Sequence, residues 1–364
     1  MPPPVHGQSV MVKTLLDGLP AHTDVRLHHV DVRLSRDAAD VGRARLGKLP
    51  VLLAACLRAC WIRLRHGPAY FYYVPAPGKR SALYRDFVVM LLCRPWFSGL
   101  ILHWHAVGLG AWLGTDGNRS ERWLAQRLLG QAKLALVLSP SLTADAAVFS
   151  PQRIAIVPNC VPDPYPKNAT LPPHGPGVAQ ILFLGLCSRS KGVFATLDAY
   201  DRLTRRFPGH FFLTIAGGFE SDHEEREFHE RLRALPPGTA RFAGFADAAA
   251  KRALYALADV FCFPTTYAHE GQPLTVLEAL AHDVPVVTTR WRALPDLLPA
   301  AHVWFVDPAQ PEELVQALAA AAADRPQGAL RHHYLAHYTP ERHLDALAAA
   351  LDDLNARAPR ATAG

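Results

Sequence analysis

Residues 259–289 read DVFCFPTTYAHEGQPLTVLEALAHDVPVVTT, and this stretch decides the fold. The apolar run at 260–263 has the length of a buried strand. A loop containing Gly271 follows it, then a helical apolar pattern that begins near Leu274, then a second apolar run at 284–289. Strand, loop, helix and strand in this order predict a βαβ unit, in which a covering helix joins two parallel strands.

The same alternation of strand-like and helical patterns extends over most of the chain. We expect strands at 25–34, 70–77, 99–106, 134–140, 153–159, 179–186, 211–218, 240–245, 259–264 and 284–289. We expect helices at 9–19, 49–66, 82–93, 120–132, 193–207, 224–235, 249–258, 273–282, 311–323 and from Pro340 to 356. The pattern predicts an α/β protein with parallel sheets that carry helices on both faces.

Length and proline content divide this pattern into two domains. The 364 residues, half of them apolar, suffice for two cores. Seven prolines lie between 158 and 177, where regular structure cannot persist. We therefore predict a first domain at 1–165, a proline-rich linker at 166–177, a second domain at 178–338 and a final helix at 339–364 that packs back on the first domain.

The start of the chain departs from a doubly wound domain. Such a domain opens with a central strand, a glycine turn and a helix. Here the segment PPPVHGQS supplies the turn and the following residues supply the helix, with no strand before them. We expect the first strand of the first domain to be missing, through a mis-set start or a truncation.

Charge is unevenly spread along the chain. Residues 1–177 contain 20 Lys and Arg against 10 Asp and Glu, a net of +10, whereas residues 178–364 contain 18 against 22, a net of −4. This distribution suggests that the first half meets something anionic. An arginine-rich coding bias is the alternative. No signal peptide and no apolar run of about 18 residues is present, so we expect a cytoplasmic protein that does not span a membrane.

Two glutamates flank the start of the predicted helix in the quoted stretch. Glu270 lies in the loop and Glu278 in the second turn, with Gly271, Gln272, Pro273, Leu274 and Thr275 between them. Free N–H groups at a helix start bind phosphate. A carboxylate can accept hydrogen bonds from two neighbouring hydroxyls. The arrangement therefore fits a nucleotide-sugar, although a capped helix with a surface glutamate is equally compatible with the pair alone.

Two cations are predicted near the same edge of the sheet. Arg189 and Lys191 lie in SRSKG, directly after the strand ILFLGL and before a helix. Ligands of open α/β sheets bind at the carboxyl ends of the strands. We expect these side chains to oppose the diphosphate, while two solvated loop cations remain the alternative.

The motifs together resemble the retaining glycosyltransferases of family four, which have the GT-B fold of two doubly wound Rossmann-like domains facing a cleft. The motifs are FLGLCSRSKGV, LTIAGG, ARFAGF and HEGQPLTVLEALAHDVPVVTT, with PPPVHGQS at the start and IVPNCVPD before the linker. The resemblance covers nearly the whole chain, and the last long motif is the most specific. One position departs from the family: Leu186 follows Gly185 where many members have arginine.

The resemblance implies that 1–165 is the acceptor-binding domain and 178–338 the nucleotide-sugar-binding domain, and it implies roles for individual residues. Glu270 would contact the donor sugar, Glu278 the ribose and Lys191 the diphosphate, while Gly217 and Phe245 would flank the base. In the first domain, Gly7 would lie beside the pyrophosphate. The segment ILHWHAVG makes His105 the candidate nearest the reacting carbon, with His103 as the fallback and a core histidine as the alternative.

The expected activity follows from the same resemblance. We expect a metal-independent retaining glycosyltransferase of the hexosyltransferase class, active in polysaccharide biosynthesis, that uses a UDP- or GDP-sugar as substrate and has no cofactor. We expect a nucleotide-sugar donor and a glycan or lipid-linked acceptor as partners. The basic first domain, and not the resemblance, suggests contact with an anionic membrane surface on the inner membrane face. We expect no contact with nucleic acid. A nucleotide-sugar epimerase of the same fold and a non-catalytic or truncated nucleotide-sugar-binding protein stay open.

Overall fold

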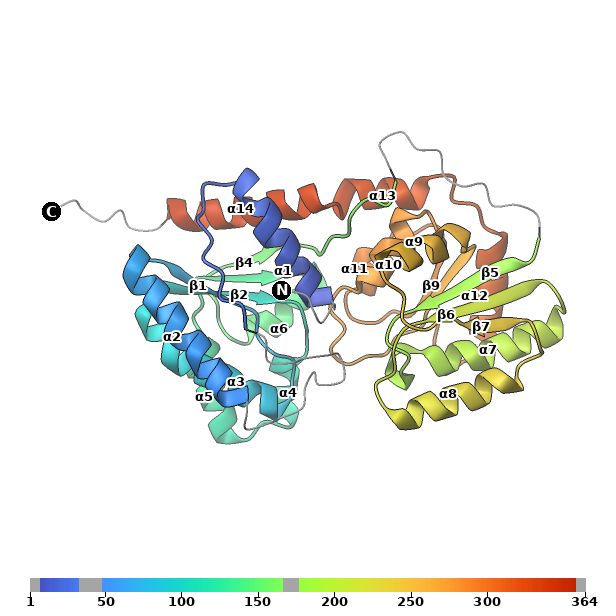
Figure 1. Cartoon of the computed structure of the whole chain (residues 1–364), viewed down its shortest axis with the longest axis horizontal. Helices are drawn as coiled ribbons and strands as arrows, with labels where there is room; N and C mark the ends of the chain where they lie inside the picture. Colours follow the sequence, from blue (N-terminus) through green and yellow to red (C-terminus); the bar gives the residue numbers. More distant parts are fainter. Residues whose placement is uncertain (1–6, 33–47, 166–176, 358–364) are drawn as a thin grey trace. The chain divides into compact units, whose positions relative to one another are not determined.

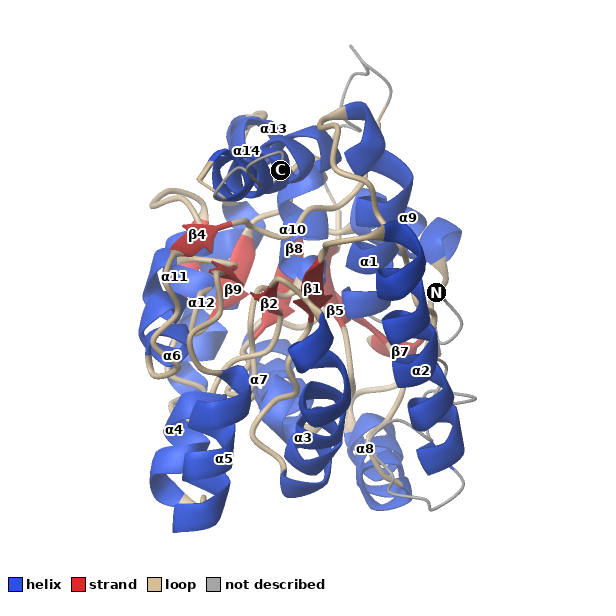
Figure 2. Ribbon diagram, turned by 90° about the vertical axis from the view of Figure 1, so that its left-hand side faces the viewer, coloured by secondary structure: helices blue, strands red, loops and turns tan. Residues whose placement is uncertain are grey.

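The computed structural model describes residues 7–32, 48–165 and 177–357, and it divides into two compact units. Unit 1 comprises Met1–Asn159 together with Pro340–Gly364, and unit 2 comprises Cys160–Thr339. The predicted linker at 166–177 lies, except for its last residue, outside the described residues. Figure 1 shows the elements of both units in sequence colours, and Figure 2 shows strands in red enclosed by helices in blue.

The described residues of unit 1 form four parallel strands in the order β1-β2-β3-β4. The strands are β1 (Tyr70–Tyr73), β2 (Gly99–Trp104), β3 (Leu134–Val137) and β4 (Ile154–Ile156). The helices are α1 (Gly7–Gly18), α2 (Lys48–His66), α3 (Arg80–Cys93), α4 (Leu109–Thr115), α5 (Arg119–Leu129), α6 (Thr143–Ala147) and α14 (Pro340–Ala356). Strands β2 and β3 are the most buried of these, and each pairs with a strand on both of its edges.

The last helix of the chain belongs to the core of unit 1. Helix α14 begins at Pro340, whose fixed φ suits a first helical position. Its leucines recur at helical spacing, and Leu344, Leu347 and Leu351 are buried with Ile101 of β2 and Leu134 of β3. An apolar stripe of this kind anchors a helix to a sheet.

In unit 2, residues 160–165 and 177–339 are described, and they form six parallel strands in the order β10-β9-β8-β5-β6-β7. The strands are β5 (Ala179–Leu184), β6 (Phe211–Ala216), β7 (Ala240–Phe242), β8 (Val260–Phe263), β9 (Val286–Thr288) and β10 (Val303–Phe305). The helices are α7 (Val193–Arg206), α8 (Asp222–Ala234), α9 (Ala248–Leu257), α10 (Leu274–Ala281), α11 (Leu294–Leu297), α12 (Pro311–Ala323) and α13 (Ala329–His337). Figure 1 shows α7 and α8 on one side of this sheet and α9 and α10 on the other.

The strand order of unit 2 reverses beside β5. The chain passes from β5 outward through β6 to β7, then returns to place β8 on the other side of β5. The helices that follow the two strands, α7 after β5 and α10 after β8, lie on opposite faces of the sheet (Figure 1). Such a topological switch point is where open α/β sheets bind ligands.

The α/β class with parallel sheets is confirmed, and one expected strand is wrong. Residues 25–32, the described part of the strand predicted at 25–34, have no strand pairing. Their alternating apolar side chains nevertheless pack, since Val25 and Leu27 contact the core of unit 1 and His28 stacks on His66 at 4.2 Å. Alternating apolar side chains therefore pack against the core here although the backbone pairs with no other strand. No described residue before Tyr70 lies in a strand.

Candidate functional site

The loops after β5 and β8 meet at the switch point of unit 2. The backbone N–H of Thr266, after β8, donates to the carbonyl of Ser190, after β5, at 2.8 Å. Gly192 permits this approach: its φ is +88°, and a Cβ there would lie 2.4 Å from the carbonyl oxygen of Pro264. The glycine between the short 3-10 turn Arg189–Lys191 and α7 therefore brings the two loops together.

Lys191 and Glu270 form an ion pair across these loops. The ammonium Nζ lies 2.7 Å from Oε2 of Glu270, and the two side chains are 15% and 6% exposed. The Thr265 hydroxyl donates to the same carboxylate oxygen at 2.9 Å. The ammonium also lies 4.3 Å from the ring centroid of Tyr267, in cation–π geometry. Burial and several partners hold both charges in one place, unlike a solvated loop cation.

The helix start that follows Glu270 has the features of an anion site. Helix α10 begins at Leu274 with Pro273 as N-cap and no side-chain cap. Gly271 and Gln272 are buried, and Pro273, Leu274 and Thr275 are half-buried. The first N–H groups of a helix have no intrahelical acceptor, and the positive end of the helix dipole favours negative charge there. The chain thus places Glu270 and a phosphate-compatible helix start in adjacent positions.

Glu278 pairs with a different cation. Its Oε1 contacts the ammonium of Lys251 on α9, while its buried Oε2 has no hydrogen-bond partner among the described residues. Burial raises the pKa of Glu278, and Lys251 opposes this shift. The side chain of Tyr255 lies close by and donates to the carbonyl of Thr275 at 2.7 Å. Glu270, in the loop before α10, and Glu278, in its second turn, therefore have separate lysine partners.

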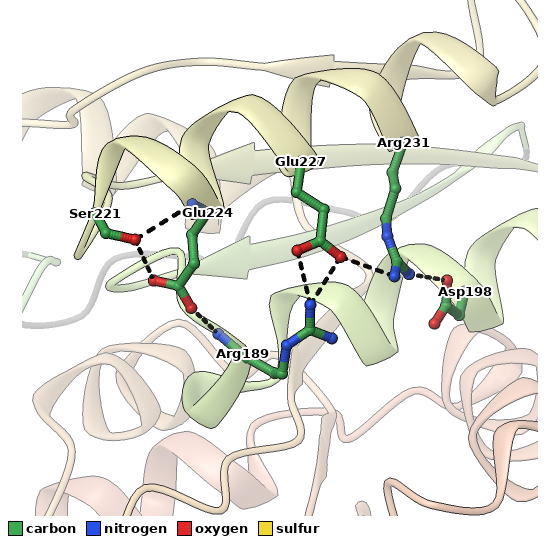
Figure 3. Close-up of polar contacts among 6 residues, drawn as sticks. All are labelled: Arg189, Asp198, Ser221, Glu224, Glu227 and Arg231. Atoms are coloured by element: carbon green, nitrogen blue, oxygen red, sulfur yellow. Dashed lines mark hydrogen bonds and ion pairs between the residues drawn. The ribbon is translucent and has the colours of Figure 1, made fainter.

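Arg189 is held by α8 (Figure 3). Its guanidinium donates to both carboxylate oxygens of Glu227 at 2.7 Å, and its backbone N–H donates to Glu224 at 2.9 Å. These bonds lower the pKa of Glu227. Arg231 continues the network, since it contacts Glu227 at 2.9 Å and Asp198 at 2.6 Å. Although Arg189 is two residues from Lys191, its side chain is bonded to a different element.

Three consecutive strand ends of unit 2 lie side by side through backbone hydrogen bonds. Gly185 donates to the carbonyl of Ala216 at 3.1 Å, and Gly217 donates to that of Gly244 at 2.9 Å. A Cβ at Gly217 would lie only 1.7 Å from the Gly185 carbonyl oxygen, so this close approach requires glycine. Phe245 follows Gly244 and is 73% exposed. The loops predicted to flank the base are therefore neighbours, with an exposed aromatic ring at their edge.

The histidines predicted from ILHWHAVG lie at the end of β2 in unit 1. The ring centroids of His103 and His105 are 4.0 Å apart, and His343 of α14 lies 6.4 Å from His103. Tyr72 bonds Nδ1 of His103, whose Nε2 is buried without a partner within the described part of the chain. Burial is the main reason that the pKa of His103 lies well below its ordinary value, and the neighbouring imidazoles His105 and His343 lower it further. Burial and His343 likewise lower the pKa of His105 to about 4. Both rings are therefore neutral at pH 7.

Gly7 is the first residue of α1 and is exposed. Its predicted place beside a pyrophosphate stays a prediction, as do the ligand roles of the other site residues. The structure brings Lys191 together with Glu270, and His103 together with His105, but bonds Arg189 to α8 instead.

Several residues of these clusters were not expected from the sequence. They are Lys251, Thr265 and Tyr267 in unit 2, and Tyr72 and His343 in unit 1. The partners of Glu278 and His103 come from elements far away in the chain, and local spacing carries no signal for such pairs. Tyr267 precedes Glu270 within the quoted stretch, so its position in that loop was the available signal.

Comparison with known proteins bears on unit 2 first. Residues 179–324 match the family model of the glycosyl transferases group 1. A curated relative, glycogen synthase of Mycobacterium tuberculosis, is 37% identical over 128 residues, which are 34% of this chain and 28% of the relative. The match thus spans well under half of the length of that relative.

Solved structures resemble the whole chain in fold. Sucrose-phosphate synthase from Thermosynechococcus elongatus has a TM-score of 0.71 at 17% identity, and the alignment covers 97% of this chain and 94% of that one. An Anabaena protein, HepE, solved with UDP and glucose, has a TM-score of 0.58 at 17% identity, with 85% and 83% covered. These similarities confirm the expected GT-B fold of two Rossmann-like domains. Within it, residues 179–324 of this chain form a domain of the glycosyl transferases group 1 family.

Proposed function

We propose that the protein is a glycosyltransferase that moves a sugar from a nucleotide-sugar donor to a glycan or lipid-linked acceptor with retention of anomeric configuration. The observation that carries the proposal is the buried contact between Lys191 and Glu270 at the switch point, next to the start of α10. The Anabaena neighbour was solved with UDP and glucose, the two parts of a nucleotide-sugar, and we propose that this site takes a donor of that class.

The chemistry would use the two loops as a charge-stabilising site. As the bond between the sugar and the diphosphate breaks, negative charge grows on the leaving phosphate oxygen. The ammonium of Lys191 and the N–H groups at the start of α10 would stabilise that charge without reorganising. Oε2 of Glu270 is already occupied by Lys191 and Thr265, so we assign Oε1 to the sugar hydroxyls.

The remaining groups would position the donor. Glu278 would accept hydrogen bonds from the ribose hydroxyls, with Lys251 keeping its carboxylate charged despite burial. Phe245, exposed beside the Gly244 turn, would contact the base. His105, neutral because its pKa is lowered to about 4, would donate or accept a hydrogen bond near the reacting carbon without adding charge.

The acceptor would be attacked on the face that the diphosphate leaves. We propose that the leaving phosphate takes the proton of the acceptor hydroxyl, so that the new bond forms on the same face and configuration is retained. UDP- or GDP-sugars are the proposed donors, and lysine with helix N–H groups would replace a metal ion at the diphosphate.

A screen of donor hydrolysis and transfer across UDP- and GDP-sugars tests the proposal. We expect release of a nucleoside diphosphate from at least one donor, at a rate that a chelator leaves unchanged, and strong loss of turnover in Glu270→Ala with the fold intact by circular dichroism. Conversion of a donor to its isomer, with no free diphosphate, would instead identify an epimerase. Binding of donors without turnover would identify a non-catalytic nucleotide-sugar-binding protein.

A further inference from the structure

Helix α2 of unit 1 is apolar on two opposite faces. One face packs inward: Leu52, Cys56 and Ala59 are buried. This face adjoins α3, since the Cys60 thiol donates to the carbonyl of Leu92 at 3.6 Å. A helix packed by one face should carry polar residues on the other. In α2 the outward face is apolar as well, so it requires a separate explanation.

The outward face carries a continuous row of large side chains, here named the α2 stripe. Leu53, Leu57, Trp61 and Leu64 are spaced by four, four and three residues, which places them on one side of the helix. Their exposed fractions are 39%, 72%, 60% and 66%. The row extends along about 16 Å of helix at the ordinary rise per residue. Grouped exposure of this kind marks an interaction surface rather than scattered surface leucines.

Basic residues border the α2 stripe. Arg58 and Arg65 are exposed and project from the helix next to Trp61. The whole helix, KLPVLLAACLRACWIRLRH, contains one lysine and three arginines and no acidic residue. A surface that is apolar in the middle and cationic at its border complements an anionic partner with an apolar interior.

We propose that the α2 stripe docks the protein on an anionic phospholipid bilayer, with the leucines and Trp61 in the boundary between headgroups and acyl chains. An amphipathic helix with basic residues beside its apolar face binds anionic membranes in this way. Tryptophan suits the boundary because one end of its ring system is apolar and the other can hydrogen-bond.

Charge favours a bilayer over a second copy of this chain. A second copy would set arginine against arginine along the same stripe, which disfavours self-association through it. None of the helices in 7–32, 48–165 and 177–357 is long and apolar enough to cross a membrane. Docking would bring a lipid-linked acceptor within reach, and in this respect the inference rests on the proposed function.

Vesicle sedimentation with the full chain tests the inference. We expect the wild type to sediment with vesicles of mixed phosphatidylglycerol and phosphatidylcholine, to stay in solution with phosphatidylcholine alone, and to be released by salt. Leu57→Gln/Trp61→Gln should weaken partitioning by about tenfold or more. Arg58→Gln/Arg65→Gln should weaken it by about tenfold through lost attraction to the anionic surface.

A matched control variant shows whether the effect is specific to the α2 stripe. Leu257 on α9 of unit 2 is 65% exposed, close to the 66% of Leu64, so Leu257→Gln should leave partitioning unchanged while Leu64→Gln weakens it. Three outcomes would overturn the inference. They are equal vesicle binding by the wild type and Leu57→Gln/Trp61→Gln, no binding of the wild type to anionic vesicles, and self-association through the stripe without vesicles. Donor hydrolysis without vesicles is assayed separately: its absence would refute the proposed function and leave the docking result standing.

Discussion

Replacing Lys191 by methionine should damage stability and ligand binding for separable reasons. The variant keeps the length of the side chain and removes its charge. The carboxylate of Glu270, which is 5% exposed, then stays buried with the Thr265 hydroxyl still donating a hydrogen bond to it. Removal of one partner of a buried ion pair costs about 3–5 kcal/mol. Because Lys191 is itself 15% exposed, we expect the low end, about 3 kcal/mol.

The double variant Lys191→Met/Glu270→Gln separates the two effects. Without the buried negative charge, the unpaired-charge penalty disappears, so its free energy of unfolding should recover by about 2 kcal/mol relative to additivity. Its affinity for UDP should not recover, because a charge-assisted hydrogen bond to the diphosphate is worth about 1.5–3 kcal/mol, or roughly tenfold to a hundredfold in affinity. Urea unfolding followed by tryptophan fluorescence and calorimetric titration with UDP measure the two quantities.

Two further variants serve as comparisons. Arg202→Met removes an exposed ion pair with Glu312 and should leave both quantities unchanged. Arg189→Met should weaken UDP binding less than Lys191→Met, because its guanidinium is held by Glu227. The reasoning is refuted if stability losses in the double variant are additive, or if the double variant binds UDP as tightly as the wild type.

Three other predictions concern pH and backbone. Burial raises the pKa of Glu278 above 4.5, so its stabilising contribution is complete below pH 4.5 and is lost as pH rises through the folded pKa. Lys251 opposes this shift, so Lys251→Met should enlarge the loss measured by urea unfolding, and the same pH profile in the variant and the wild type would contradict that opposing effect. The pKa of His105 is lowered from 6.5 to about 4, so the unfolded chain binds a proton at this residue more readily than the folded protein does. Stability should therefore fall as pH falls from 6.5 to 4, and His105→Asn should flatten this dependence in thermal melts. Gly192→Ala should destabilise clearly more than Gly238→Ala, because both have positive φ but a Cβ contacts backbone only at the first position; equal melting temperatures would contradict the close approach of the two loops.

Periodicity predicted the elements well where a strand or helix buries one continuous face. The strands β2, β3, β5, β6, β8 and β9 and the long helices were all expected, because their apolar runs have the period that burial demands. The short elements α4, α6, α11 and β10 were not expected, since three to seven residues carry too few repeats of a period. The segment 25–32 shows the opposite failure, where alternation packs side chains without pairing the backbone.

In the candidate site, too, some contacts could be predicted from the sequence and others could not. Lys191 and Glu270 could be predicted to meet, because each follows a strand end and parallel strands share one edge. Their approach depends on Gly192, which the motif SRSKG contains. The attachment of Arg189 to Glu227 could not be predicted, because α8 lies over that loop only once β5 and β6 are adjacent.

The lysine partner of Glu278 was beyond sequence reasoning for a similar reason. Lys251 comes from a helix on the return crossover from β7 to β8, and no local pattern links it to the helix start of α10. The cluster of His103, His105 and His343 likewise requires α14 to pack in unit 1 before the third ring can join.

A structure of the full chain with UDP or GDP bound tests the central claim most directly. The account predicts that the diphosphate lies against unit 2, with an oxygen about 3 Å from the Nζ atom of Lys191 and with the first N–H groups of α10 directed at it. A nucleotide bound elsewhere on unit 2, with the lysine and Glu270 still paired only to each other, would contradict it.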